Sequence, residues 1–378
     1  MSSQHFFFVP AVVGFAAAFV TAPAWERRLR GRVWVDTPRP ERHAKRPVSR
    51  AGGAAWLTGL LAGMAAGIAA ATGALGGWSR FGVRDPSGAM ATWTPDRGLI
   101  AFAPSGIVGL VAVLAFVLGR LDDRNLVQPG RKWVLQVAIL AVGTLGLLWA
   151  SGSRGIFPGV GFGTGSADPA GNLVLLAVAF FAAVVLQVAL EILDHLDGLL
   201  AVHAVAGAAA LALAAAPGWA RDAGLAACGA SLGFLYWNRP PARLYLGNAG
   251  SLVVATVLPL LLIVLAMRVA SGIGPECRLG PDLGLSWDAR GPASVGRSDS
   301  AVVSPWRFLA VLPVFAWPLL DLTVVTLARV RRGDPPWKGG CDHLAHRFAR
   351  RLGSDGASLA VGALAAATGF LLAAKGLR

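Results

Sequence analysis

Residues Glu191-Ile192-Leu193-Asp194-His195-Leu196-Asp197-Gly198-Leu199-Leu200 place three acids and one histidine between two long apolar runs. An ionisable side chain at or near a bilayer costs on the order of a few kcal/mol unless it faces a cavity, a partner or an ion. Asp194 and Asp197 stand three residues apart, which on a helix puts both carboxylates on one face. We therefore expect this segment to belong to a functional site that binds one cation or a phosphate-bearing ligand.

The composition is that of a membrane protein. Of the 378 residues, 55% are hydrophobic and 14% are charged, and the mean hydropathy is +0.60. Glycine and alanine are abundant inside the apolar runs, as expected where helices pack closely in lipid. Cys228, Cys277 and Cys341 fall in a predicted span, an outer loop and an inner loop, so they suggest no disulfide framework.

Ten apolar segments are each long enough to cross the roughly 30 Å hydrocarbon layer as a helix. The sequence therefore predicts an all-α, polytopic helix bundle that forms a single integral-membrane domain over residues 1–378. The predicted spans are about 6–24, 54–76, 99–118, 134–150, 172–190, 198–215, 222–237, 251–271, 308–328 and 357–375.

Positive charge sets the predicted orientation. The segments on one side of this threading hold 22 of the 34 lysine and arginine residues, and such an excess marks the cytoplasmic face. Arginines follow the first span rather than precede it, the reverse of a cleaved signal peptide, so we expect a retained helix. Both termini then lie outside. The predicted cytoplasmic segments are 25–53, 119–133, 191–197, 238–250 and 329–356.

The net charge of +14 raises the question of nucleic acid. That partner would need a basic face on a folded domain or a basic tail. Here the positive residues flank membrane spans, where anionic lipid explains them better. We expect the lipid bilayer as a partner and no nucleic acid.

The polar motifs all fall on the predicted cytoplasmic segments, which favours one site assembled from several loops. Asp122-Asp123 alone would fit a solvated helix end paired with Arg120 or Arg124. Together with the acids of 191–197, the pair favours a divalent-metal and phosphate site, because Mg²⁺ takes carboxylate, phosphate and water oxygens. The glycines of 247–251 open a span, where helix N–H groups can meet an anion.

The segment around His343 and His346 has three interpretations. Phosphate or sugar binding by these histidines and Arg347 is favoured, and a basic juxtamembrane helix at lipid headgroups is the alternative. A zinc site made of Cys341, His343 and His346 lacks a fourth ligand. Asp321 lies inside a predicted span and needs a partner such as a histidine or arginine, or a catalytic role.

A series of motifs runs from about residue 35 to residue 353. The motifs are Val35-Asp36-Thr37-Pro38 with Arg42-His43 and residues 47–53, Leu121-Asp122-Asp123 with Lys132 and Gln136, and then residues 194–199, 238–242, 247–251, 318–321 and 343–347. Together they resemble the polyprenyl-phosphate N-acetylhexosamine-1-phosphate transferases of glycosyltransferase family 4. This family includes phospho-MurNAc-pentapeptide translocase and the undecaprenyl-phosphate GlcNAc-1-phosphate transferases, and the motifs at 318–321 and 343–347 favour the GlcNAc branch.

The resemblance implies transfer of a sugar 1-phosphate from a UDP-sugar to polyprenyl (undecaprenyl) phosphate, with release of UMP. It further implies a multi-pass protein of the inner (cytoplasmic) membrane with its site on the cytoplasmic face, and Mg²⁺ or Mn²⁺ as cofactor. The implied catalytic residues are Asp122, Asp123 and Asp197. The implied substrate-binding residues are Lys132, Asn238, His343, His346 and Arg347. The implied metal ligands are Asp194, Asp197, Asn248 and Glu191.

The chain departs from the family pattern at five positions, one of which is Ser49 in place of a proline. Asn248 stands for an aspartate, Glu191 for an asparagine, His195 for a glycine and Ala345 for a histidine. An amide oxygen can bind Mg²⁺ but brings no negative charge, and we expect Glu191 to restore that charge. The alternative is a non-catalytic homologue that binds lipid-linked glycan or an assembly partner. A transporter is disfavoured because the charges cluster at one membrane face. A homodimer is left open.

Overall fold

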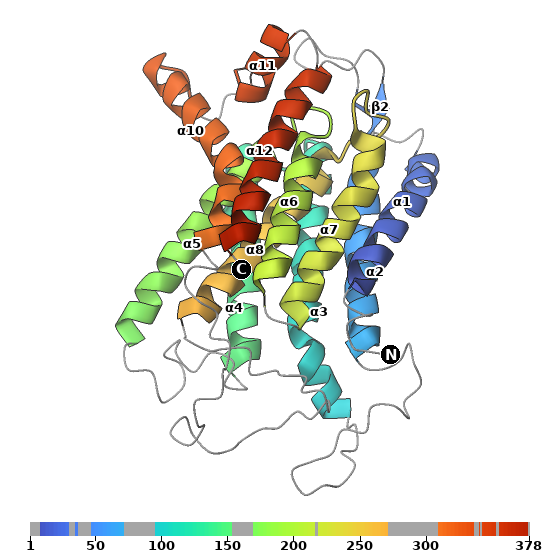
Figure 1. The fold of residues 1–378 in the computed structure, drawn as a ribbon, viewed down its shortest axis with the longest axis vertical. Coiled ribbons are helices and arrows are strands. Elements are labelled where there is room, and N and C mark those ends of the chain that lie inside the picture. Colours follow the sequence, from blue (N-terminus) through green and yellow to red (C-terminus); the bar gives the residue numbers. More distant parts are fainter. Residues whose placement is uncertain are drawn as a thin grey trace, which may run out of the picture.

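A computed structural model describes residues 8–29, 35–36, 47–71, 95–152, 169–215, 218–270, 309–335, 340, 342–352 and 355–376. Over these residues the chain forms a bundle of eleven α-helices with one 3-10 helix and two short strands (Figure 1). The helices are α1 (Val9–Leu29), α2 (Gly52–Ala71), α3 (Pro95–Asp123), α4 (Pro129–Gly152), α5 (Pro169–Ile192), α6 (Leu199–Ala214), α7 (Trp219–Asn238), α8 (Gly247–Ala270), η3 (Leu312–Phe315), α10 (Ala316–Arg331), α11 (Leu344–Leu352) and α12 (Asp355–Gly376).

The predicted spans coincide with helices of the bundle. Six helical segments are long and apolar enough to cross a membrane: Val9–Leu29, Gly52–Ala70, Ala103–Asp123, Pro129–Ala150, Gly247–Met267 and Leu309–Arg331. Three shorter apolar segments are Leu176–Ile192, Leu199–Ala214 and Leu359–Lys375, and α7 occupies the place of the remaining predicted span. The chain is therefore a multi-pass membrane protein. That all ten cross the membrane stays a prediction.

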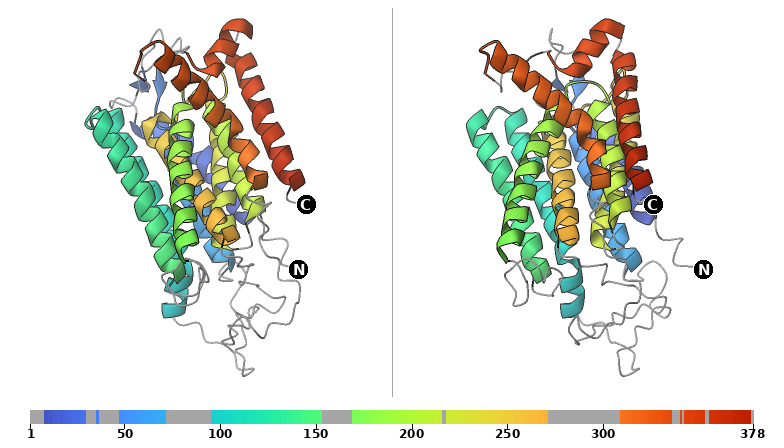
Figure 2. Two further views of the ribbon diagram at one scale, coloured as in Figure 1. Left: turned by 90° about the vertical axis from the view of Figure 1, so that its left-hand side faces the viewer. Right: turned by 60° about the vertical axis from the view of Figure 1, so that its left-hand side comes forward.

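Helix α8 forms the core of the bundle. Apart from the half-buried Asn248, every residue from Gly247 to Met267 is buried, and the helix contacts α2, α3, α4, α5, α6 and α7. Two further views show α8, drawn in gold, among the other helices of the bundle (Figure 2). A helix that is apolar all round suits either a core or a lipid-facing span, and its contacts place α8 in the core. The N-terminus of α8 is thereby fixed against its neighbours, which matters for the site.

Small residues let α1, α2 and α7 pack closely. A Cβ atom on Gly229 of α7 would come within 2.0 Å of the Ala11 carbonyl oxygen of α1, and one on Gly59 of α2 within 2.7 Å of the Gly14 carbonyl oxygen. Glycines at such contacts are expected where helices associate in lipid. The indole N–H of Trp56 also donates to Ser231, in a buried hydrogen bond of 2.9 Å between α2 and α7.

The structure is mostly helical, as predicted, and adds one short hairpin. Strands β1 (Val35–Asp36) and β2 (Val48–Ser49) pair antiparallel, with Val35 opposite Ser49 and Asp36 opposite Val48. Tyr245 N–H donates to the Ser49 carbonyl at 2.8 Å, so the hairpin is fastened to the segment that leads into α8. Strands of two residues carry too little periodicity to be predicted from sequence.

Helix α11 corresponds to the basic juxtamembrane helix that the sequence offered as an alternative for the segment around His343 and His346. Its Ala345 and Ala349 are buried and one turn apart, whereas Arg350 and Arg351 are exposed, as in an amphipathic surface helix. Strand β2 and α11 lie at the same end of the bundle (Figure 1). The polar groups described next lie at this end.

Candidate active site at one end of the bundle

Asp123, the last residue of α3, lies over the N-terminus of α8. Its Oδ1 accepts the backbone N–H of Asn248 at 3.1 Å, and its Oδ2 accepts that of Ala249 at 3.4 Å. These N–H groups have no partner within their own helix, and the helix dipole favours a negative charge there. Gly247 enters α8 with φ of +68°, a conformation that glycine adopts at little cost.

Two arginines complete the surroundings of Asp123. Its Oδ1 lies 3.4 Å from Arg50 Nη1, and its Oδ2 lies 3.1 Å from Arg120 Nη1. Arg50 also contacts the buried Asp36 of the hairpin at 2.7 Å. With four donors around it, the Asp123 carboxylate is fully engaged in joining α3, α8 and the hairpin. The sequence alone allowed an ion pair between Asp122 or Asp123 and Arg120, and Asp123 forms it. The other three contacts of Asp123 were not suggested by the sequence.

The neighbouring Asp122 takes part in a second, more accessible group of side chains. We call Asp122, Lys132, Glu191 and Asn248 the carboxylate cluster. Lys132 Nζ lies 2.7 Å from Asp122 Oδ2 and also contacts Glu191, and the Asn248 amide donates to the same Asp122 oxygen at 2.7 Å. Gln136 donates to Glu191. Helices α3, α4, α5 and α8 each contribute one member of this cluster.

The turn between α5 and α6 carries Asp194 and Asp197. Asp197 Oδ2 accepts the backbone N–H of Ala242 at 2.9 Å. The buried Asn238 accepts the Gly198 N–H at 2.9 Å and donates to the Leu244 carbonyl at 2.9 Å. The oxygen and the nitrogen of the Asn238 side chain therefore link the turn between α5 and α6 to the segment after α7.

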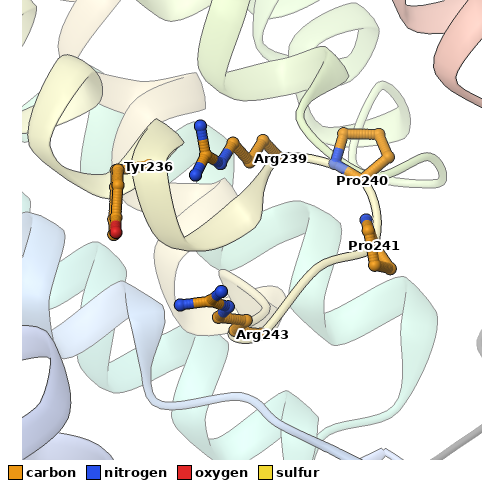
Figure 3. A pocket seen from close by; sticks show the side chains of 5 residues that line it. All are labelled: Tyr236, Arg239, Pro240, Pro241 and Arg243. Atoms are coloured by element: carbon orange, nitrogen blue, oxygen red, sulfur yellow. The ribbon is translucent and has the colours of Figure 1, made fainter.

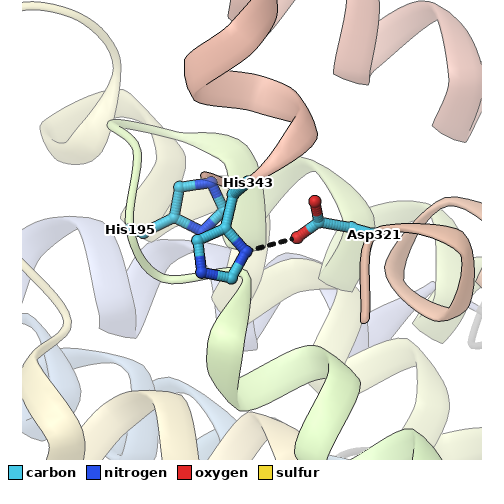
Figure 4. A group of neighbouring side chains, drawn as sticks. All are labelled: His195, Asp321 and His343. Carbon is cyan, nitrogen blue, oxygen red and sulfur yellow. Dashed lines mark hydrogen bonds and ion pairs between the residues drawn. The ribbon is translucent and has the colours of Figure 1, made fainter. Parts of the chain in front are cut away.

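The same turn presents His195 to a third group, which we call the histidine cluster: His195, His343, His346 and Asp321. The ring of His195 stacks on that of His343 with centroids 4.4 Å apart and lies 4.7 Å from that of His346. His343 Nδ1 lies 2.9 Å from Asp321 Oδ2 (Figure 4). The Leu344 N–H donates to Asp321 Oδ1 at 2.6 Å. The partner expected for the intramembrane Asp321 is thus His343.

Asp342 fixes the segment that bears His343. Arg329 donates to both of its oxygens, at 2.7 and 3.1 Å, and Arg332 donates at 2.9 Å. The hydrogen bond from Arg329 holds the pKa of the Asp342 carboxyl well below its usual range. Arg347 donates through Nε to the Asp342 carbonyl at 2.9 Å. The histidines therefore sit on a segment anchored to the end of α10.

A hollow of about 460 Å³ lies after α7. It is lined by Tyr236, Arg239, Pro240, Pro241 and Arg243 (Figure 3). The Arg239 guanidinium stands 4.7 Å from the centroid of the Tyr236 ring. Arg239 and Arg243 therefore bring positive charge to the segment after α7, whose Ala242 contacts Asp197.

Comparison with known proteins agrees with these motifs. The family described as glycosyl transferase family 4 matches residues 106–266. Over 356 residues, the chain is 28% identical to decaprenyl-phosphate N-acetylglucosaminephosphotransferase of Mycobacterium tuberculosis, a match that covers 89% of this chain and 75% of that protein. Residues 106–266 of the chain are therefore similar to glycosyl transferase family 4. The family predicted from the sequence motifs is confirmed.

Other relatives are similar to the chain over different lengths. The protein of the same name from Mycolicibacterium smegmatis is 27% identical over 356 residues, covering 89% of this chain and 75% of that one. Phospho-N-acetylmuramoyl-pentapeptide-transferase of Picosynechococcus sp. is 32% identical over 189 residues, covering 43% of this chain and 50% of that protein. This last match spans half of the relative's length.

The family match contains the carboxylate cluster but ends before the histidine-bearing segment. The structure brings Asp122, Lys132, Glu191 and Asn248 together, and separately His195 with His343 and His346. The common metal site predicted from Asp194, Asp197, Asn248 and Glu191 stays a prediction, as do the roles assigned to Asn238 and Arg347. Arg42, His43 and Cys341 lie outside the described residues.

Several residues of this region were not named as site residues from the sequence. Arg50 and Arg329 stand beside the acids that they contact, and His195 was treated only as a departure from the family pattern. Arg50 lies in the predicted cytoplasmic segment 25–53, and Arg329 begins the predicted cytoplasmic segment 329–356, which bears His343 and His346. The positions of Arg50 and Arg329 in predicted cytoplasmic segments could have marked them as candidate site residues. Their partners could not be predicted, because these depend on packing between helices.

Proposed function

We propose that this protein transfers a sugar 1-phosphate, expected to be N-acetylhexosamine 1-phosphate, from a UDP-sugar to polyprenyl (undecaprenyl) phosphate. UMP is released, and the product starts a cell-surface glycan. The observation that carries the proposal is the carboxylate cluster, in which Asp122, Glu191 and Asn248 meet Lys132. The two mycobacterial relatives are both decaprenyl-phosphate N-acetylglucosaminephosphotransferases by name, which supports the same reaction class.

We place the reaction at the cytoplasmic face of the inner membrane. Ten crossings with both termini outside would put the five segments that together hold most of the lysine and arginine on that side. In support, hydrogen bonds and ion pairs link four of these segments through Arg50 to Asp123, Lys132 to Glu191, and Asp197 to Ala242. A cytosolic sugar nucleotide would reach this end of the bundle without crossing the membrane.

The reaction must bring two phosphate-bearing substrates together. An oxygen of the lipid phosphate forms a bond to the β-phosphorus of the UDP-sugar, and the bond from that phosphorus to the bridging oxygen of UMP breaks. Lys132 is a partly buried cation held by Asp122 and Glu191, and it can bind the lipid phosphate. Asp122 can accept a proton from that phosphate or orient it. Positioning and charge stabilisation supply most of the catalysis in such transfers.

The histidine-bearing segment suits the sugar nucleotide. His343 and His346 are held by Asp321 and by packing against His195, and Arg347 is anchored by its Nε to the Asp342 carbonyl. Fixed imidazole and guanidinium groups can donate hydrogen bonds to a diphosphate or to sugar hydroxyls. These residues would orient the donor while Lys132 and Asp122 orient the acceptor.

The donor set fits an Mg²⁺ or Mn²⁺ cofactor. Asp122 and Glu191 already converge on one cation, the Lys132 ammonium, and the amide of Asn248 lies against Asp122. These are hard oxygen donors of the kind that both ions prefer, and Asp194 and Asp197 stand on the adjoining turn. When bound, the ion would neutralise phosphate charge. Glu191 supplies the carboxylate that Asn248 lacks.

The proposal is tested by UMP release from purified protein in detergent with undecaprenyl phosphate, Mg²⁺ or Mn²⁺ and a panel of UDP-sugars. We expect metal-dependent release with at least one sugar, lost in Asp122→Asn. Glu26→Gln, an acid-to-amide change in α1 outside the clusters, is the matched control and should keep the activity. If protein that unfolds cooperatively, and is therefore folded, releases no UMP with any sugar, the transferase proposal is wrong. That result would favour the non-catalytic homologue that binds lipid-linked glycan or an assembly partner.

A further inference from the structure

The histidine cluster has the geometry of a metal site. One ligand atom each from His195, Asp321 and His343 lie within 4.8 Å of one another. Among the described residues this is the one such group of three or more histidine, cysteine, aspartate or glutamate side chains. The three residues come from the α5–α6 turn, from α10 and from the segment before α11, so only the fold brings them together (Figure 4).

The hydrogen bonds of His195 leave one nitrogen ready to bind an ion. Its Nδ1 lies 2.7 Å from the Ile192 carbonyl oxygen, and because a carbonyl only accepts, Nδ1 carries the proton. The Nε2 atom therefore holds a lone pair. It is buried and has no hydrogen-bond partner within the described part of the chain. Burial lowers the pKa of His195 to about 3, in keeping with a neutral imidazole.

Asp321 and His343 offer two ligand atoms side by side. Asp321 Oδ2 lies 2.9 Å from His343 Nδ1, so one ion that displaces the proton between them can bind both atoms. Asp321 is 1% exposed and is itself held by the Leu344 N–H. With Nδ1 on the ion, the Nε2–H of His343 is left to donate to a substrate.

We propose that His195, His343 and Asp321 form a binding site for a divalent ion of the zinc class. Two imidazoles and one carboxylate suit Zn²⁺, whereas Mg²⁺ prefers oxygen ligands alone. The His346 ring, 4.7 Å from that of His195, is placed to add a fourth ligand. The site goes beyond the proposed transfer reaction and is separate from the carboxylate cluster.

The site also answers the objection to zinc that the sequence raised. Cys341, His343 and His346 lacked a further ligand, and the structure supplies His195 and Asp321 from distant parts of the chain. A bound ion would join the α5–α6 turn to α10 and to the segment that leads into α11. It would thereby restrain both segments to which the proposed function assigns substrate contacts.

Zinc binding by the full chain tests the proposal directly. Purified protein in detergent is stripped with a chelator, incubated with Zn²⁺ in the presence of excess Mg²⁺, freed of unbound metal and analysed for zinc. We expect about one ion per chain and a rise in the unfolding temperature, both lost in His195→Gln. Equal zinc content in wild type and His195→Gln would overturn the proposal.

His203→Gln is the matched control. His203 is also buried, its Nδ1 lies 2.9 Å from the Leu199 carbonyl, and its Nε2 has no hydrogen-bond partner among the described residues. Its ring neighbour, however, is Trp317 at 6.4 Å rather than another histidine. This variant should keep its zinc. Loss of zinc in both variants to the same extent would indicate unfolding or non-specific binding and would also overturn the proposal.

A spectroscopic test needs no variant. Co²⁺ in a four-coordinate site with nitrogen ligands absorbs strongly in the visible region, whereas Co²⁺ bound by six oxygens absorbs weakly. We expect a strong visible band when Co²⁺ is added to the stripped wild type, displaced by Zn²⁺ but not by Mg²⁺. Absence of this band would overturn the site, whether or not the protein releases UMP.

Discussion

Asp123 and Asn248 form the contact on which the site is built: Oδ1 of Asp123 accepts the backbone N–H of Asn248 at 3.1 Å. The contact ties the end of α3 to the beginning of the central helix α8. It also sets the adjacent Asp122 beside the Asn248 side chain, at 2.7 Å. The two consecutive acids thus have different surroundings, because one is enclosed by four donors and the other faces the partly exposed Lys132.

This difference predicts that changing aspartate to asparagine mainly lowers stability at Asp123 and mainly lowers activity at Asp122. Asp123→Asn removes the charge that offsets Arg50, Arg120 and the α8 terminus, and we expect it to cost about 3 kcal/mol of stability. Asp122→Asn breaks a partly exposed pair and should cost about 1 kcal/mol or less, while transferase activity falls about 100-fold or more. Thermal unfolding in detergent and UMP release separate the two effects. Equal destabilisation by both changes would contradict this prediction.

The carboxylate cluster predicts that Glu191 compensates for Asn248. Glu191→Gln removes the only carboxylate besides Asp122 on Lys132 among the described contacts. We expect the concentration of Mg²⁺ needed for half-maximal activity to rise about 10- to 100-fold. Adding Asn248→Asp to this variant should lower the required Mg²⁺ concentration again, because it places a new carboxylate beside Asp122.

Titration of UMP release with Mg²⁺ in the wild type, Glu191→Gln and the double variant checks this exchange. Glu26→Gln again serves as the acid-to-amide control. An Mg²⁺ requirement that does not change in Glu191→Gln would rule out the compensation. A double variant no better than Glu191→Gln would place Asn248 outside the ion's surroundings.

The sequence predicted the helices well because hydropathy and length alone define a span. The predicted spans 251–271 and 222–237 lie close to α8 and α7. The location of the site at one end of the bundle followed from charge asymmetry. The two-residue strands escaped prediction because so short a segment has no period to detect.

The pairing of side chains was harder to predict than their location. Asp321 was expected to need a partner because it lies within a span, but only packing could select His343. The capping of α8 by Asp123 likewise depends on how two helices cross. Asn238 was assigned to substrate from the family resemblance alone, whereas its amide is used by two backbone groups.

The crossing of α3 and α8 predicts a strong effect of one methyl group. A Cβ atom at Gly119 would lie 2.3 Å from the Asn248 carbonyl oxygen, so Gly119→Ala must push the helices apart. We expect a loss of about 1–3 kcal/mol and reduced activity, since Asp122 moves with α3. Gly106→Ala on the same helix meets nothing within 4 Å and should be neutral or slightly stabilising. Unfolding temperatures of the pair check the prediction, which would fail if the two changes were equivalent.

The contacts of Asn238 predict a structural rather than a substrate-binding effect. Asn238→Ala leaves the Gly198 N–H and the Leu244 carbonyl without their partner, which should cost about 2 kcal/mol. Asn238→Asp keeps an acceptor for Gly198 but loses the donor to Leu244, so its loss should be smaller. In both variants we expect the unfolding temperature to fall while KM for the UDP-sugar changes little. If KM instead rises in Asn238→Asp at an unchanged unfolding temperature, Asn238 contacts the substrate, as the family resemblance implied.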